Sequence, residues 1–142
     1  GRDAGRDEIL AVLDEMAAAD SRIVRVRSLG PRYPRVLAAV DAVVGNSSSG
    51  VIEAASVGVP AVDVGRRQQG RLRAESVVHA EGSAQSVADS LATVLSDTAR
   101  AAARETVNPY GNGAAASLVV DAVRFAATLP ETKTFVTIGD AR

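Results

Sequence analysis

The sequence predicts an α/β domain in which a parallel sheet carries helices on both faces. Short aliphatic runs of strand length alternate along the chain with stretches of helical length. Hydrophobic residues make up 46% of the 142 residues, whereas aromatic residues make up only 3%, so the core must be built from Ala, Val, Leu and Ile. Buried parallel strands have this composition because helices cover both of their faces.

The first third of the chain predicts two helices and two strands. Residues 7–19 carry apolar side chains at helical spacing and acidic residues in the first turn. Residues 22–28 (RIVRVRS) predict a short strand. A helix is expected near residues 32–40, with Pro34 in its first turn, where the missing N–H is tolerated. Residues 42–45 (AVVG) form an apolar run that is typical of a strand.

The middle of the chain continues the alternation. Residues 50–57 (GVIEAASV) predict a helix that Gly58 closes. Residues 60–64 (PAVDV) predict a strand that leads into a basic loop at 65–71 (GRRQQGR). Residues 75–79 (ESVVH) are a further strand candidate.

The last third is expected to be helical. Helices are predicted at about 84–95 and 97–105. The segment 108–113 (NPYGNG) breaks the chain with a turn, and a final helix is expected over about 114–128.

Composition limits the function classes. The chain has no cysteine, which excludes disulfides, thiolate metal sites and cysteine nucleophiles. The net charge of -1 gives no general attraction to nucleic acid or to an anionic membrane. No apolar run reaches the roughly 20 residues that span a bilayer, no signal peptide opens the chain, and no cluster of metal ligands is evident. We therefore expect a cytoplasmic protein without nucleic-acid or membrane partners, metal or cofactor. Because the chain starts without Met, we also expect a piece of a larger protein.

The loop between the strand at 42–45 and the following helix has the features of a phosphate site. Its backbone N–H groups and the helix N-terminus suit an anion, its glycines permit close approach, and its serines add hydroxyl donors. The GK[ST] ending of a Walker loop is missing. The alternative is that the serines only cap the helix. The candidate residues are Gly45, Asn46, Ser47, Ser48, Ser49 and Gly50.

Glu53 is expected in the first turn of that helix. Its carboxylate could accept hydrogen bonds from the ribose hydroxyls of a nucleotide whose phosphates lie on the preceding loop. The alternative is structural, since with Gly50 as N-cap Glu53 would occupy the third helical position and favour the helix dipole.

The basic loop at 65–71 carries two glycines and three guanidinium groups. Beside a phosphate loop they would neutralise a diphosphate with bidentate contacts; the alternative is a solvated basic surface loop. Gln68 could contact a uracil edge or face water. Both loops follow predicted parallel strands, and ligands bind beyond the carboxyl ends of such strands. The sole histidine, His79, is interpreted as a structural residue, and no carboxylate pair suited to proton abstraction is evident.

Residues 42–71, AVVGNSSSGVIEAASVGVPAVDVGRRQQGR, resemble the signature of the hydrolysing UDP-N-acetylglucosamine 2-epimerases of sialic-acid and related nonulosonic-acid pathways. The turn NPYG at 108–111, with Gly113, is similar to a turn of that family. The start, Gly1 to Arg6, is similar to the segment that opens the family's second domain, and Lys133-Thr134-Phe135 is similar to its chain end. The resemblance therefore spans nearly the whole chain.

The resemblance implies a Rossmann-like fold, the carboxyl-terminal half of a two-domain architecture like that of B-type glycosyltransferases. Residues 1–142 would form one UDP-binding domain, with the active site in the cleft facing an amino-terminal domain absent from this sequence. It implies that Ser47 and Ser48 contact the UDP diphosphate and that Glu53 contacts the ribose. Arg67, Gln68 and Arg71 would lie at the nucleotide end of the cleft.

The implied reaction removes the C2 proton of UDP-N-acetylglucosamine, eliminates UDP through a glycal and adds water to give N-acetylmannosamine. The acid and base carboxylates of the family lie in the amino-terminal domain, so the catalytic residues are unknown here and we expect the isolated chain to be inactive. The implied partners are the UDP-sugar substrate and that missing domain. A homo-oligomer is also consistent with the resemblance because family members often form dimers.

Two departures leave alternatives open. Asp63 stands where the family has asparagine, and Arg66 stands where an acidic residue is common. The two could form a local charge pair, or they could mark a subfamily with another sugar nucleotide. The alternatives to a hydrolysing epimerase are a non-hydrolysing 2-epimerase, a glycosyltransferase donor domain and a non-catalytic UDP-sugar-binding module. The triple serine and the RQxGR pattern at 67–71 favour the hydrolysing branch.

Overall fold

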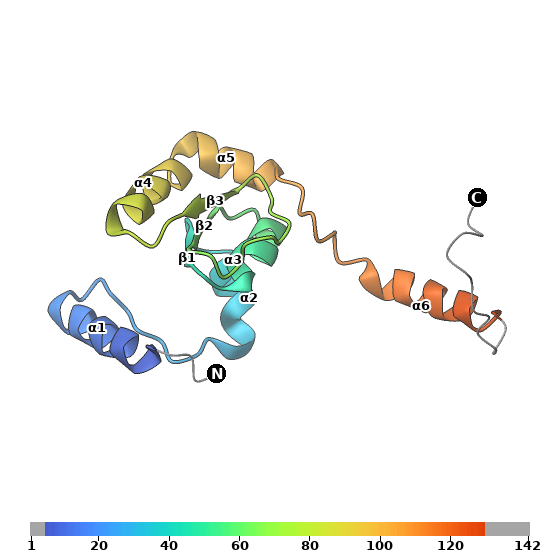
Figure 1. The fold of residues 1–142 in the computed structure, drawn as a ribbon, viewed down its shortest axis with the longest axis horizontal. Helices are drawn as coiled ribbons and strands as arrows, with labels where there is room; N and C mark the ends of the chain where they lie inside the picture. The colour runs from blue at the N-terminus through green and yellow to red at the C-terminus, as the bar shows by residue number, and fades with distance from the viewer. Residues whose placement is uncertain (1–4, 130–142) are drawn as a thin grey trace, which may run out of the picture. The chain divides into compact units, whose positions relative to one another are not determined.

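The computed structural model describes residues 5–129 and divides into two compact units, with the boundary between Ala39 and Val40 (Figure 1). The family resemblances noted at the start of the chain and at Lys133-Thr134-Phe135 fall wholly or partly on residues 1–4 and 130–142, which lie outside the described residues.

The first unit contains helix α1 (Arg6–Ala19), a 3-10 turn η1 (Gly30–Arg32) and helix α2 (Tyr33–Leu37). The prediction of a helix at 7–19 is therefore confirmed. Asp20 ends α1, and its carboxylate accepts hydrogen bonds from the Arg22 side chain, which lowers the pKa of that carboxyl. The helix expected near 32–40 is shorter than predicted, but Pro34 does lie in its first turn.

The prediction of a strand at 22–28 is wrong. This segment has no strand conformation, and two of its apolar residues are open to solvent, with Val24 79% and Val26 54% exposed. A β-strand is stabilised by hydrogen bonds to a neighbouring strand, and no sheet of the described residues includes this segment. An alternating apolar pattern was therefore not sufficient to define an element here.

The second unit contains a three-stranded parallel sheet in the order β1-β2-β3, formed by β1 (Val43–Gly45), β2 (Ala61–Val64) and β3 (Val77–Ala80). In register, Gly45 lies opposite Asp63, and Asp63 lies opposite His79. The strands at 42–45, 60–64 and 75–79 are thus confirmed, with shifts of one or two residues at their ends.

The remaining elements of this unit are α3 (Ser48–Ile52), the 3-10 helix η2 (Ala54–Val57), α4 (Ala84–Val94), α5 (Asp97–Glu105) and α6 (Ala115–Ala126). Ser83 and Ser96 cap α4 and α5, because each side chain accepts a hydrogen bond from a backbone N–H of the first turn. The helices predicted at 84–95, 97–105 and 114–128 are confirmed.

Helices cover both faces of the sheet. Because side chains alternate along a strand, Val62 points to one face and Ala61 to the other. Val62 packs in a core with Ala80 of β3 and Val94 of α4. On the opposite face, α3 approaches so closely that a Cβ added to Gly50 would lie 3.6 Å from the Val43 side chain and 3.8 Å from Ala61. The α/β, Rossmann-like prediction is confirmed.

Gly58 ends η2 in the left-handed conformation, with φ of 69°. A Cβ at this position would lie 3.1 Å from the Cα of Arg104, so glycine permits the close approach of α5 as well as the turn. In α6, by contrast, no residue is buried. No helix within residues 5–129 is both long and apolar enough to cross a bilayer.

Candidate functional site

The two predicted loops leave the sheet at the same edge. β1 ends at Gly45 and β2 ends at Val64, and the parallel register sets Gly45 opposite Asp63, so both chains turn away from neighbouring strand ends. Gly45 has a backbone φ of 152°, a value that residues with a Cβ rarely adopt. The carboxyl edge of a parallel sheet is where ligands bind in folds of this type.

The serine loop, residues 45–50, begins its helix earlier than expected. Ser47 has extended backbone angles, and its Oγ accepts a hydrogen bond of 3.3 Å from the Ser49 N–H. Ser47 is therefore the N-cap, and the prediction that Gly50 caps the helix is wrong. A serine is the better cap because its oxygen satisfies an N–H of the first turn, which a glycine cannot do. Gly50 is instead buried within α3.

The position of Glu53 changes with the start of the helix. Glu53 follows the last residue of α3 and precedes η2, so it does not lie in the first helical turn as predicted. The alternative that Glu53 serves the dipole at the helix N-terminus is therefore wrong as well. Its carboxylate is exposed, as are the side chains of Asn46 and Ser47, while Ser48 and Ser49 are half-buried.

The basic loop, residues 65–71, is anchored to the serine loop by Gln68. This residue is only 4% exposed, and its Nε2 donates a 2.8 Å hydrogen bond to the backbone carbonyl of Asn46. Gln68 therefore does not face water, although its Oε1 is buried without a partner. Arg66, Arg67 and Arg71 are exposed around this anchor.

Asp63 forms an ion pair beneath the basic loop. Its side chain is 1% exposed, and Oδ2 lies 2.8 Å from Nη2 of Arg73. The same guanidinium nitrogen donates to the Gln68 carbonyl at 3.5 Å. A buried carboxylate needs a cation that can reach it, and Arg73 meets this requirement.

The local charge pair considered for Asp63 and Arg66 does not form in the described chain. Arg66 instead donates to the Gln69 side chain at 3.4 Å, on the exposed side of the loop. His79 also has partners that the sequence did not suggest. Its Nδ1 lies 4.0 Å from Asp63 Oδ2, and its Nε2 lies 3.4 Å from Glu81 Oε1. The register between β2 and β3 brings His79 beside Asp63.

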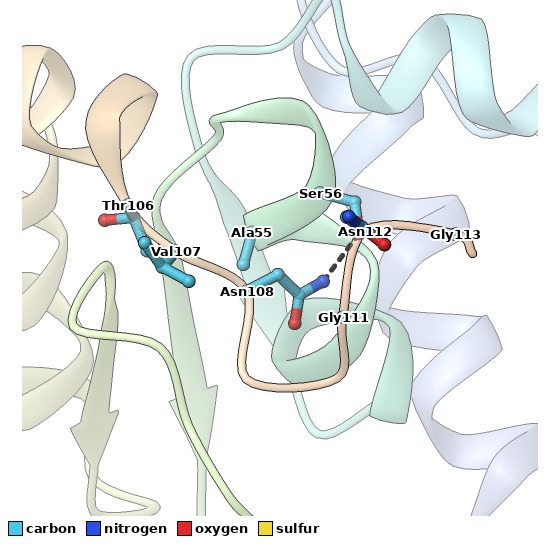
Figure 2. A pocket seen from close by; sticks show the side chains of 8 residues that line it. All are labelled: Ala55, Ser56, Thr106, Val107, Asn108, Gly111, Asn112 and Gly113. Carbon is cyan, nitrogen blue, oxygen red and sulfur yellow. Dashed lines mark hydrogen bonds between the residues drawn. The ribbon is translucent and has the colours of Figure 1, made fainter. Parts of the chain in front are cut away.

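A pocket of about 790 Å³ lies beside the turn at 108–113 (Figure 2). It is lined by residues 55, 56, 106–108 and 111–113, which include none of the predicted contacts. Asn108 connects this turn to α3 and η2 through its side-chain amide, and Tyr110 connects it to the chain that follows the basic loop. Sequence reasoning identified the turn but did not assign these contacts to it.

Comparison with known proteins identifies the family. Residues 2–124 match the family described as UDP-N-acetylglucosamine 2-epimerase. Over 48 residues, the chain is 42% identical to a protein of Neisseria meningitidis serogroup B named UDP-N-acetylglucosamine 2-epimerase. This stretch covers 34% of the chain and 13% of that relative's length. Since the family match extends over most of the sequence, the chain belongs to the UDP-N-acetylglucosamine 2-epimerase family.

Proposed function

We propose that this chain is the UDP-binding half of a hydrolysing UDP-N-acetylglucosamine 2-epimerase. Family membership supports the epimerase assignment. The observation that carries the binding role is the hydrogen bond between Gln68 and the Asn46 carbonyl, because it holds a hydroxyl-rich loop and a guanidinium-rich loop together at one edge of the sheet. A diphosphate requires this combination of hydroxyl donors and positive charge.

Each side chain has a role in the proposed complex. The hydroxyls of Ser47 and Ser48 and the N–H groups of their loop donate to the diphosphate. Arg67 and Arg71 balance its charge, and the exposed carboxylate of Glu53 accepts hydrogen bonds from the ribose hydroxyls. Gln68 joins the two loops through its Nε2, whereas its Oε1 is buried.

The proposed reaction has two steps. A base removes the proton from C2 of the sugar while the bond between C1 and the UDP oxygen breaks, which gives a glycal and UDP. Water then adds its hydroxyl to C1 and a proton to C2, which gives N-acetylmannosamine. This chain contributes stabilisation of the negative charge that develops on the departing diphosphate.

We propose that the acid and base groups come from a second domain. Of the carboxylates of the described chain that lie near the two loops, Glu53 is assigned to the ribose, Asp63 is buried in its ion pair, and Glu81 lies 3.4 Å from His79. The purified chain is therefore expected to release no N-acetylmannosamine from UDP-N-acetylglucosamine. Release by pure chain would contradict this division of labour.

Calorimetric titration of the chain with UDP tests the binding role, and a separate titration with ADP is the control. Selective binding of UDP is expected, and Ser48→Ala and Glu53→Ala should each weaken it. Ser117→Ala is the matched control because Ser117 lies on exposed α6 and its hydroxyl, among residues 5–129, bonds only the Ala114 carbonyl. A folded chain that binds UDP no better than ADP would refute the proposal.

In the intact enzyme, the product distinguishes the hydrolysing from the non-hydrolysing reaction. Free N-acetylmannosamine with UDP is expected, whereas UDP-N-acetylmannosamine would identify the non-hydrolysing reaction. The preference for hydrolysis rests on the triple serine at 47–49 and on the RQxGR pattern at 67–71.

A further inference from the structure

Residues 108–111 form a β-turn that is closed by a backbone hydrogen bond. The Gly111 N–H donates to the Asn108 carbonyl at 3.0 Å, which closes the turn, and the Tyr110 N–H donates to Asn108 Oδ1 at 2.9 Å. Asparagine at the first position, proline at the second and glycine at the fourth are the residues that a type I turn favours. Gly111 has φ of 99°, a conformation that only glycine adopts readily.

The Asn108 side chain holds the junction that carries Glu53. Its Nδ2 donates to the Ile52 carbonyl at 2.8 Å and to Ser56 Oγ at 2.6 Å, and Figure 2 shows the amide directed at Ser56. Ile52 precedes Glu53 at the end of α3, and Ser56 follows it in η2. The carbonyls at a helix end lack partners within the helix, so Asn108 both caps α3 and fixes the backbone on either side of Glu53.

The Tyr110 side chain holds the end of the basic loop. Its hydroxyl donates to the Leu72 carbonyl at 3.0 Å, and Leu72 directly follows Arg71. The Leu72 side chain is 66% exposed, so packing of that side chain contributes little to fixing this part of the backbone. The Tyr110 hydroxyl therefore adds an anchor at Leu72, beside the one that Arg73 makes with Asp63.

We propose that the turn at 108–111 is a positioning element for nucleotide binding. Asn108 sets the carboxylate of Glu53 for the ribose, and Tyr110 sets the basic loop for the diphosphate. The turn contacts two separate segments of the candidate site and thereby fixes the distance between them. A site held in this way loses less conformational freedom when the ligand binds. This inference rests on the proposed function, since it assigns roles relative to bound UDP.

Asn108→Asp tests the first half of the inference. The aspartate keeps the shape and the acceptor for the Tyr110 N–H but loses both donors. We expect the affinity of the chain for UDP to fall about tenfold. The preference for UDP over 2′-deoxy-UDP should also fall, because Glu53 would no longer be aligned with the ribose. The two ligands have the same charge, so this ratio is insensitive to the added carboxylate.

Asn112→Asp is the matched control. It introduces the same charge into the same segment, and the aspartate keeps the acceptor that Asn112 Oδ1 provides to the Ala114 N–H at 3.2 Å. Among the described residues, Asn112 forms no hydrogen bond or ion pair with the α3–η2 junction or with the basic loop, so both the UDP affinity and the 2′-deoxy-UDP ratio should be unchanged.

Tyr110→Phe tests the second half with a smaller change. It removes one hydroxyl from a side chain that is 41% exposed, so folding should be retained. We expect the preference for UDP over UMP to fall about threefold, because a free basic loop contacts the second phosphate less often. The affinity for uridine itself should not change.

The outcomes separate the two proposals. A native chain that does not select UDP over ADP refutes the proposed function and this inference together. A native chain that selects UDP, with Asn108→Asp weakening UDP and 2′-deoxy-UDP equally and Tyr110→Phe weakening UDP and UMP equally, refutes the inference alone. If Asn108→Asp does not fold, the Tyr110→Phe ratio decides the question.

Discussion

The serine loop and the basic loop leave the same edge of the sheet but are held in place by different means. The serine loop is organised locally, because the Ser47 side chain caps the helix that begins one residue later. The basic loop depends on distant residues: Gln68 reaches back to Asn46, Arg73 connects the loop to Asp63, and Tyr110 binds the Leu72 carbonyl. The helix cap of the first loop should therefore be insensitive to changes elsewhere in the chain, whereas the position of the second loop should not.

The largest expected effect tests the dependence of the basic loop on Arg73. Arg73→Met leaves the buried carboxylate of Asp63 without its cation, and breaking a buried pair from one side costs about 3–5 kcal/mol. Because the Arg73 side chain is itself 26% exposed, we expect a loss near the lower end, about 3 kcal/mol, in the free energy of unfolding measured with urea.

A control variant and a double variant accompany this experiment. Arg71→Met is the control, since Arg71 is exposed and its loss should change stability by no more than about 0.5 kcal/mol. Adding Asp63→Asn to Arg73→Met should recover part of the loss because it removes the unpaired charge. If Arg73→Met proved as mild as Arg71→Met, the ion pair would not be holding the loop.

A second experiment cuts the direct connection between the loops. Gln68→Leu fills a similar volume but leaves the Asn46 carbonyl without its donor, so we expect a destabilisation of about 1–2 kcal/mol. Faster hydrogen exchange should be confined to the two loops. Gln69→Leu, at an exposed neighbouring position, should have little effect. Equal losses in the two variants would show that the loops are not joined through Gln68.

The same contrast explains what the sequence could predict. Strands and helices of the second unit were found because their patterns are local: aliphatic runs of strand length that alternate with stretches of helical length. The edge shared by the two loops followed from the parallel topology alone. The strand at 22–28 failed for the opposite reason, since strand formation depends on a partner that the segment's own residues do not specify.

The contacts of the candidate site were harder to predict than its location. Gln68 is buried and points to Asn46, and Asn108 reaches Ile52, yet neither pairing has a spacing that indicates it in the sequence. Asp63 gave a partial signal, because a carboxylate in an aliphatic strand requires a cation. The arginine nearest to Asp63 in the sequence is not its ion-pair partner. Arg66 lies on the exposed side of the loop, whereas the guanidinium of Arg73 contacts the Asp63 carboxylate.

The smallest expected effect concerns the serine loop and distinguishes a local cap from a long-range anchor. Ser47→Ala removes the oxygen that accepts the Ser49 N–H, and loss of such a cap costs about 1 kcal/mol. Ser47→Gly should cost only a few tenths of a kcal/mol, because glycine is tolerated at this position. Both values come from urea unfolding, and Ser117→Ala is the reference for loss of a serine hydroxyl outside a cap. Hydrogen exchange should increase in α3 and remain unchanged in residues 65–71, since the basic loop is held through the Asn46 carbonyl and not through the Ser47 side chain. Increased exchange in both loops would show that the cap supports the basic loop as well as α3.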